Sequence, residues 1–77
     1  MAAEELRKAF SQARAAFDAL KTVDERIRET RQEIRRHKSG SGQRRVLNGR
    51  LIQMNDEWDS AHDQFKRACE RFMRLIE

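Results

Sequence analysis

The chain of 77 residues has no proline or tyrosine, only three glycines and one cysteine, and aromatic residues make up 6% of it. Strand-rich folds need many turns, and turns draw on glycine and proline, so this scarcity argues against a sheet protein. The lone Cys69 cannot form an internal disulfide, so the sequence gives no sign of an oxidising compartment. Charged residues reach 39%, which is typical of long solvent-exposed helices. We therefore expect an all-α protein.

Long apolar runs are also missing. No segment approaches the roughly 18 consecutive apolar residues of a membrane span. The start, Met-Ala-Ala-Glu-Glu, lacks the basic-then-apolar order of a signal peptide. With a hydrophobic content of 38%, the chain has room for one small core, so residues 1–77 are expected to form a single domain. We expect a soluble, cytoplasmic protein with no membrane partner.

The clearest pattern lies in the second half of the chain, where apolar residues recur at alternating steps of four and three. This period is typical of a helix that packs on another helix along its full length. It predicts a helix over about 43–76, continuous through Gly49, which falls on the outer face. The seam positions are Leu47, Leu51, Met54, Trp58, Ala61, Phe65, Ala68, Phe72 and Leu75.

The first half repeats this rhythm and predicts a helix over about 3–37. Glu4 and Glu5 in its first turn complement the positive end of the helix dipole. Two charged residues, Asp24 and Arg31, interrupt the expected seam. Its positions are Leu6, Phe10, Ala13, Phe17, Leu20, Asp24, Ile27, Arg31 and Ile34.

A loop at about 38–42, Lys-Ser-Gly-Ser-Gly, separates the two helices, and its composition favours a turn. The same composition is that of a flexible linker, so we assign it no functional role. Two helices joined by so short a loop fold back antiparallel, as a two-helix coiled-coil hairpin. One register then pairs both seams from end to end, with Phe10 facing Phe72, Phe17 facing Phe65, and Asp24 facing the indole N–H of Trp58.

Two helices bury too little apolar surface to offset easily the entropy of ordering about 70 residues. Spare apolar residues lie beside the expected seam, towards the end that holds both termini. We therefore predict self-association into a four-helix bundle, with a different helical protein as the second possibility. The residues expected to mediate it are Ala9, Ala16, Val23, Cys69, Met73 and Ile76.

Positive charge is concentrated around the loop. The net charge is +4, but residues 25–50 alone hold nine basic and three acidic residues. Basic residues also recur every seven positions along the first helix, which places them on one edge beside the seam. Such edges often only cover the seam; alternatively, this one binds an acidic protein surface or phosphates. The predicted basic surface comprises Arg7, Arg14, Lys21, Arg28, Arg35, Arg36, Arg44 and Arg45.

Candidate chemistry is sparse. Asp59 and His62 have a spacing found in metal-binding bundles, but the motif occurs once and no second inward carboxylate set accompanies it. Cys69 lies about 10 Å along the helix from His62, too far for a nucleophile and its base. The loop also lacks the lysine of a phosphate-binding loop. We expect no metal, no cofactor and no enzymatic activity.

These observations predict a small non-enzymatic interaction protein, an adaptor, chaperone or inhibitor that docks its basic surface on a partner protein. The first alternative is a regulator that binds nucleic acid through phosphate contacts of the same basic residues, without free aromatic side chains for base stacking. The second is a structural fragment of a larger coiled coil.

Overall fold

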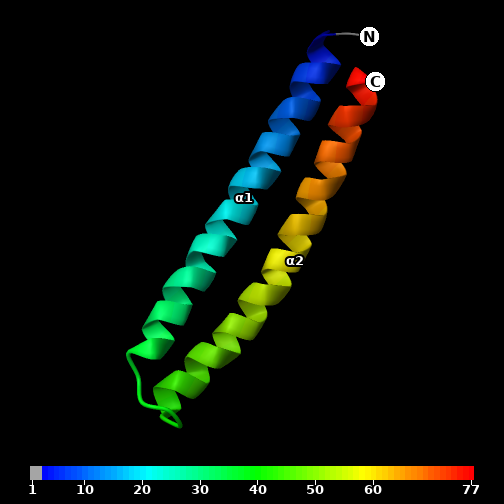
Figure 1. Ribbon diagram of the computed structural model, residues 1–77. Coiled ribbons are helices and arrows are strands. Elements are labelled where there is room, and N and C mark those ends of the chain that lie inside the picture. Colours follow the sequence, from blue (N-terminus) through cyan, green and yellow to red (C-terminus); the bar gives the residue numbers. More distant parts are fainter. Residues whose placement is uncertain (1–2) are drawn as a thin grey trace.

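The computed structural model describes residues 3–77, and this part of the chain folds into two α-helices joined by a short turn (Figure 1). Helix α1 spans Ala3–Arg35 and helix α2 spans Gly42–Ile76. They run antiparallel and contact each other along their length, so both termini lie at one end of a rod of 58 × 14 × 14 Å. Residues 3–77 contain no strand. The predicted all-α helical hairpin is confirmed.

Helix α1 ends two residues before the expected position because the chain tightens there. The N–H groups of Arg36 and His37 donate to carbonyls only three residues back, those of Glu33 at 3.0 Å and Ile34 at 3.2 Å. Such bonds tighten the last turn of a helix. Gly40 then adopts a φ of +82°, a left-handed conformation that favours glycine, and the chain reverses.

Helix α2 begins one residue earlier than predicted. The Ser41 hydroxyl caps it by accepting a hydrogen bond from the Arg44 N–H at 3.1 Å. The helix continues through Gly49, as predicted, because a helical glycine on the outer face leaves the ladder intact at a modest cost. Nothing lies within 4 Å of the point where a side chain would begin at Gly49, so the residue faces open space.

The predicted seam of α2 is confirmed throughout, since all nine positions are buried or half-buried. Two ring pairs confirm the register of the hairpin. The ring centroids of Phe10 and Phe72 are 5.9 Å apart, and those of Phe17 and Phe65 are 5.5 Å apart, with both pairs tilted. Tilted aromatic pairs at these distances are favourable contacts.

The expected seam of α1 is wrong at three of its positions, Phe10, Phe17 and Arg31, and its polar member Asp24 is only half-buried. Phe10 and Phe17 remain 53% and 48% exposed, and Arg31 is exposed. The buried face instead alternates steps of three and four, so it is turned by about 50° around the helix axis. It comprises Leu6, Ala9, Ala13, Ala16, Leu20, Val23, Ile27, Thr30 and Ile34.

Side-chain size explains this rotation. Small alanines at the contact let two helices approach closely, whereas a ring at the same place would hold them apart. Ala9 is accordingly only 4% exposed, and Phe10 and Phe17 reach the rings of α2 from the side.

The polar member of this seam, Thr30, is 7% exposed. Its hydroxyl donates to the Arg26 carbonyl at 2.8 Å and lies 3.4 Å from Sδ of Met54. A hydroxyl that bonds to its own helix in this way is satisfied without a partner on the other helix, which explains why a threonine fits the buried face.

The predicted hydrogen bond between Asp24 and the Trp58 indole does not form in the described part of the chain. The Asp24 carboxylate pairs with Arg28 at 3.3 Å, and the Trp58 indole stacks on the His62 ring with centroids 4.9 Å apart. The rotation of α1 moves Asp24 off the centre of the seam, where its carboxylate reaches Arg28 and solvent.

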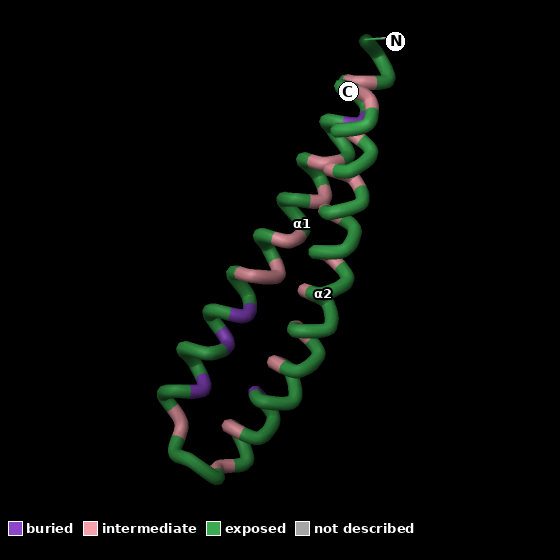
Figure 2. Tube along the Cα trace, turned by 45° about the vertical axis from the view of Figure 1, so that its right-hand side comes forward, coloured by how far each residue is buried: buried purple, intermediate pink, exposed green. Residues whose placement is uncertain are grey.

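Burial is uneven along the rod (Figure 2). Four of the five buried residues, Ile27, Thr30, Ile34 and Leu47, lie in the half that contains the turn. Among the described residues of the half that contains the termini, only Ala9 is buried, and the larger side chains there keep part of their surface in water. The core is therefore closed near the turn and incomplete near the termini.

Candidate interaction surface

One side of the hairpin is polar and bridged. We call it the polar flank, defined by Gln12, Arg26, Glu57 and Arg71. Arg26 and Glu57 form an ion pair of 3.5 Å between the helices, and the Arg71 guanidinium donates to Oε1 of Gln12 at 3.1 Å. Both ion-pair side chains are about half exposed, at 52% and 51%. They therefore add little stability but occupy this side of the seam with polar groups.

The other side is apolar near the termini. We call it the open flank, defined by Phe10, Phe17, Cys69, Met73 and Ile76. Three of its residues, Phe10, Met73 and Ile76, are 50–53% exposed, and Phe17 is 48% exposed. Phe10 and Phe17 directly follow the seam residues Ala9 and Ala16 of α1, and Cys69 and Ile76 directly follow the seam residues Ala68 and Leu75 of α2. In an antiparallel helix pair, residues at such equivalent positions lie on the same flank, so Cys69 and Ile76 lie beside Phe17 and Phe10. This flank presents large apolar side chains that no other part of the hairpin covers.

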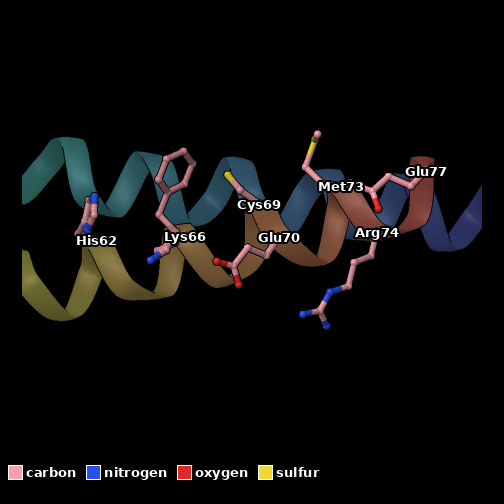
Figure 3. Close-up of a pocket in the computed structure, with 8 residues that line it drawn as sticks. His62, Lys66, Cys69, Glu70, Met73, Arg74 and Glu77 are labelled. Carbon is pink, nitrogen blue, oxygen red and sulfur yellow. The ribbon is translucent and has the colours of Figure 1, made fainter.

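A shallow hollow along α2 forms part of the open flank (Figure 3). Phe65, Cys69 and Met73 line its apolar side, and Lys66, Glu70 and Arg74 line its charged side. In Figure 3 the sulfur atoms of Cys69 and Met73 point away from the charged groups of Lys66, Glu70 and Arg74. A second hollow near the termini brings Leu6 and Phe10 of α1 together with Phe72 of α2. The open flank is thus a continuous apolar surface with a charged border.

The basic stripe, defined by Arg7, Arg14, Lys21, Arg28 and Arg35, lies further from the seam than expected. Because the buried face of α1 contains Ala9 and Ala16, its centre is turned about 50° away from the stripe. The stripe therefore lies on the outer side of α1, next to the open flank. All five side chains are exposed, and Arg28 pairs with Asp24.

An acidic stripe runs along α2 and was missed in the sequence. Asp56, Asp63, Glu70 and Glu77 are spaced seven residues apart, so they share one face, and all four are exposed. Asp63 pairs with Arg67 at 3.1 Å within α2. The seven-residue recurrence could have revealed the stripe, because it is the same signal that revealed the basic one. On the outer side of α2, it borders the open flank at the opposite edge from the basic stripe.

The turn carries the second group of basic residues, the basic tip, defined by Arg36, Lys38, Arg44, Arg45 and Arg50. Residues 36–50 contain these five basic residues and no acid, and the first turn of α2 also lacks an acid. Four of the five are exposed; Arg44 is half-buried, and its guanidinium lies 3.5 Å from the His37 carbonyl. The positive end of the α2 dipole adds to this charge.

The structure divides the residues predicted to mediate self-association into two groups. Ala9, Ala16 and Val23 belong to the seam of the hairpin itself, since Ala9 is buried and the other two are half-buried. They are not spare surface, because the rotation of α1 turns them towards α2. Cys69, Met73 and Ile76 lie on the open flank, so only these three of the six are placed where another chain could reach them.

Within residues 3–77, no three His, Cys, Asp or Glu side chains converge in a way that could hold a metal ion. No described helix is long and apolar enough to cross a membrane. Comparison with models of protein families, with curated proteins and with solved structures finds no significant match to this chain. The functional inference therefore depends on the surface alone.

Proposed function

We propose that the protein is a non-enzymatic interaction module that docks a basic helical surface on an acidic face of a partner protein, as an adaptor, chaperone or inhibitor. The observation that carries this proposal is the basic tip, where five basic residues gather over residues 36–50 without one acid. Unpaired positive charge of this density attracts acidic surfaces and accelerates their association. We place its action in the cytoplasm, where the lone Cys69 stays reduced.

The working form in this proposal is a homodimer arranged as a four-helix bundle. A lone hairpin keeps the apolar open flank in water, with Met73 and Ile76 half exposed. Helix pairs remove such surface most simply by packing on a second pair. The basic tip lies at the end of the rod away from the open flank, so both surfaces can be used at the same time.

The docking function is tested by reversing charge at the basic surface. A tagged chain is used to capture partners from nuclease-treated lysate, and we expect an acidic protein to be retained at low salt and released as salt rises. The quadruple variant carries glutamate at Arg36, Lys38, Arg44 and Arg45, all of which belong to the basic tip. The matched control carries glutamate at three exposed basic residues away from the tip, Lys8, Arg67 and Arg74.

We expect the quadruple variant to lose the captured protein and the control to retain it. Both variants must show the helical circular dichroism of the parent chain, so that a loss reflects the surface and not the fold. Equal retention by all three chains would remove the basic surface from the function.

The competing proposal is a regulator that binds nucleic acid through phosphate contacts. The arginine-rich basic tip favours it, since arginine binds phosphate oxygens in bidentate geometry. The aromatic rings are engaged elsewhere: Phe10 and Phe17 pack on Phe72 and Phe65, and Trp58 stacks on His62. Binding would therefore depend on charge and vary little with base sequence. A mobility shift with a DNA or RNA duplex that weakens steeply with salt supports this alternative, and no shift at low salt excludes it.

A further inference from the structure

The open flank and the two charged stripes complement each other across a two-fold axis. We propose that a second copy of this chain covers the open flank, with the axis parallel to the helices, so that α1 of each copy packs on α2 of the other. This inference rests on the proposed dimer and names the surface that builds it. The acidic partner of the basic stripe is then the acidic stripe of a second copy.

The register of the hairpin brings the two stripes to matching heights. Phe10 lies beside Phe72, and Phe17 lies beside Phe65. Because the helices are antiparallel, the residue three positions before each α1 phenylalanine is level with the residue three positions after the α2 phenylalanine beside it. Arg7 is then level with Leu75, two residues from Glu77, and Arg14 is level with Ala68, two residues from Glu70. Two residues are about 3 Å of helix rise, well within the reach of an arginine side chain.

The same offset continues towards the turn, where Lys21 is level with Ala61, two residues from Asp63, and Arg28 is level with Met54, two residues from Asp56. Each of these four basic residues on α1 is therefore level with a residue of α2 that lies two positions before an acidic residue of the acidic stripe. Within one hairpin these stripes lie on opposite outer sides and cannot pair. Between two copies they meet along both outer edges of the interface.

Charge also selects between the two symmetric arrangements that place open flank on open flank. An axis perpendicular to the rods brings α1 against α1 and α2 against α2, which sets basic stripe against basic stripe and acidic against acidic. An axis parallel to the rods brings α1 against α2, and the stripes then attract. Lys66 and Arg74 are basic exceptions on the border of α2. Asp59, seven residues before Lys66, and Glu70, four residues before Arg74, offset their charge.

Apolar burial favours the same arrangement. The exposed apolar residues of the open flank lie in the half of the hairpin that contains the termini. Only an axis parallel to the rods places this half against the same half of the second copy without shifting the two hairpins lengthwise. The whole side of the hairpin that contains the open flank is 58 Å long and two helices wide, which gives roughly 1,100 Å² per copy, above the roughly 800 Å² per partner of a standard interface. The open flank fills the half of this side near the termini, and the charged stripes extend the contact towards the turn. Both basic tips then project from the same end of the bundle.

The pairing is tested with two single charge reversals, Arg14→Glu and Glu70→Arg, in sedimentation equilibrium. A homodimer of either variant contains two like-charged pairs, and we expect its dissociation constant to rise roughly 10- to 100-fold. A one-to-one mixture of the two variants forms a heterodimer in which both pairs are again opposite in sign, so we expect near-parental affinity. Lys8→Glu, an exposed change of the same charge on the other side of α1, is the control and should leave the dimer intact.

The direction of the axis is tested by a distance. In a Cys69→Ser background, a spin label at Ser39→Cys marks the turn of each copy. The proposed dimer places the two labels across a bundle about 20 Å wide, so we expect a separation below about 35 Å. The perpendicular axis places them at opposite ends of the assembly, 58 Å or more apart.

Three results would overturn the inference: a parental chain that stays monomeric up to about 0.5 mM, a long label separation, or a mixture that dimerises no better than its parts. None of them bears on the basic tip, whose reversal leaves Arg14 and Glu70 unchanged. Retained docking by the quadruple variant together with the expected charge-swap result would mean that the docking function fails and the dimer stands. Loss of docking without any charge-swap effect would mean that the dimer fails and the docking function stands.

Discussion

Replacement of Ala9 by leucine tests the buried face of α1 directly. If Phe10 were the seam residue, as the sequence pattern predicts, Ala9 would lie at the border of the seam, and leucine there would be neutral or slightly stabilising. In the structure Ala9 is 4% exposed, so three additional carbon atoms have no free space. Overpacking of this kind costs about 1–3 kcal/mol. For a domain of this size, the melting temperature should fall by roughly 4–20 °C.

The matched control is Ala15→Leu, which makes the same change at an exposed position of the same helix. Its cost should be no more than a few tenths of a kcal/mol, because leucine and alanine differ little in helix propensity. Both variants are unfolded by heat and by urea, followed by far-ultraviolet circular dichroism at one protein concentration, since dimerisation makes stability concentration-dependent. A difference between them below about 0.5 kcal/mol would show that Ala9 does not face α2 and would refute the rotated seam.

Four further substitutions probe other parts of the hairpin in the same assay. Ile27→Ala removes a buried side chain that is 6% exposed and should cost about 2–5 kcal/mol; a cost below about 1 kcal/mol would mean that the half near the turn is not closed. Gly49→Ala should stabilise by about 0.5–1 kcal/mol because the position is helical and open, whereas Gly40→Ala should destabilise because its φ is +82°; the same sign for both would contradict the backbone described. Arg26→Ala should cost less than about 1 kcal/mol because its ion pair is half exposed, and a larger loss would give this pair a structural role.

The seam of α2 could be derived from the chain alone because only one phase of its pattern is apolar throughout. From Leu47 to Leu75 each seam position is apolar, and a shift by one residue would bring charged side chains such as Arg71 into the contact. The hairpin and its register followed in the same way, since only one pairing aligns two long seams around a short loop. The confirmed ring pairs of Phe10 and Phe17 depend on this register.

The phase of α1 was predicted wrongly because two phases of its pattern compete, and the phase with the larger side chains also contains the charged Asp24 and Arg31. One contains Phe10 and Phe17, and the other contains Ala9 and Ala16. The large rings favour the first phase and the absence of charged residues favours the second. The choice also depends on how closely α2 approaches, and this distance exists only once both helices are in place. Close approach selects the alanines and leaves the rings on the flank.

The sequence by itself determined a basic, all-helical hairpin and the register of its two helices, because period and charge are properties of the chain. Only the tertiary structure decided which sides of the hairpin are covered. A rotation of about 50° in one helix moved three predicted surface residues into the contact with α2 and left two phenylalanines on the open flank. The physical reason is that a helix turns around its axis to minimise the gap to its neighbour, and side-chain volume sets that gap.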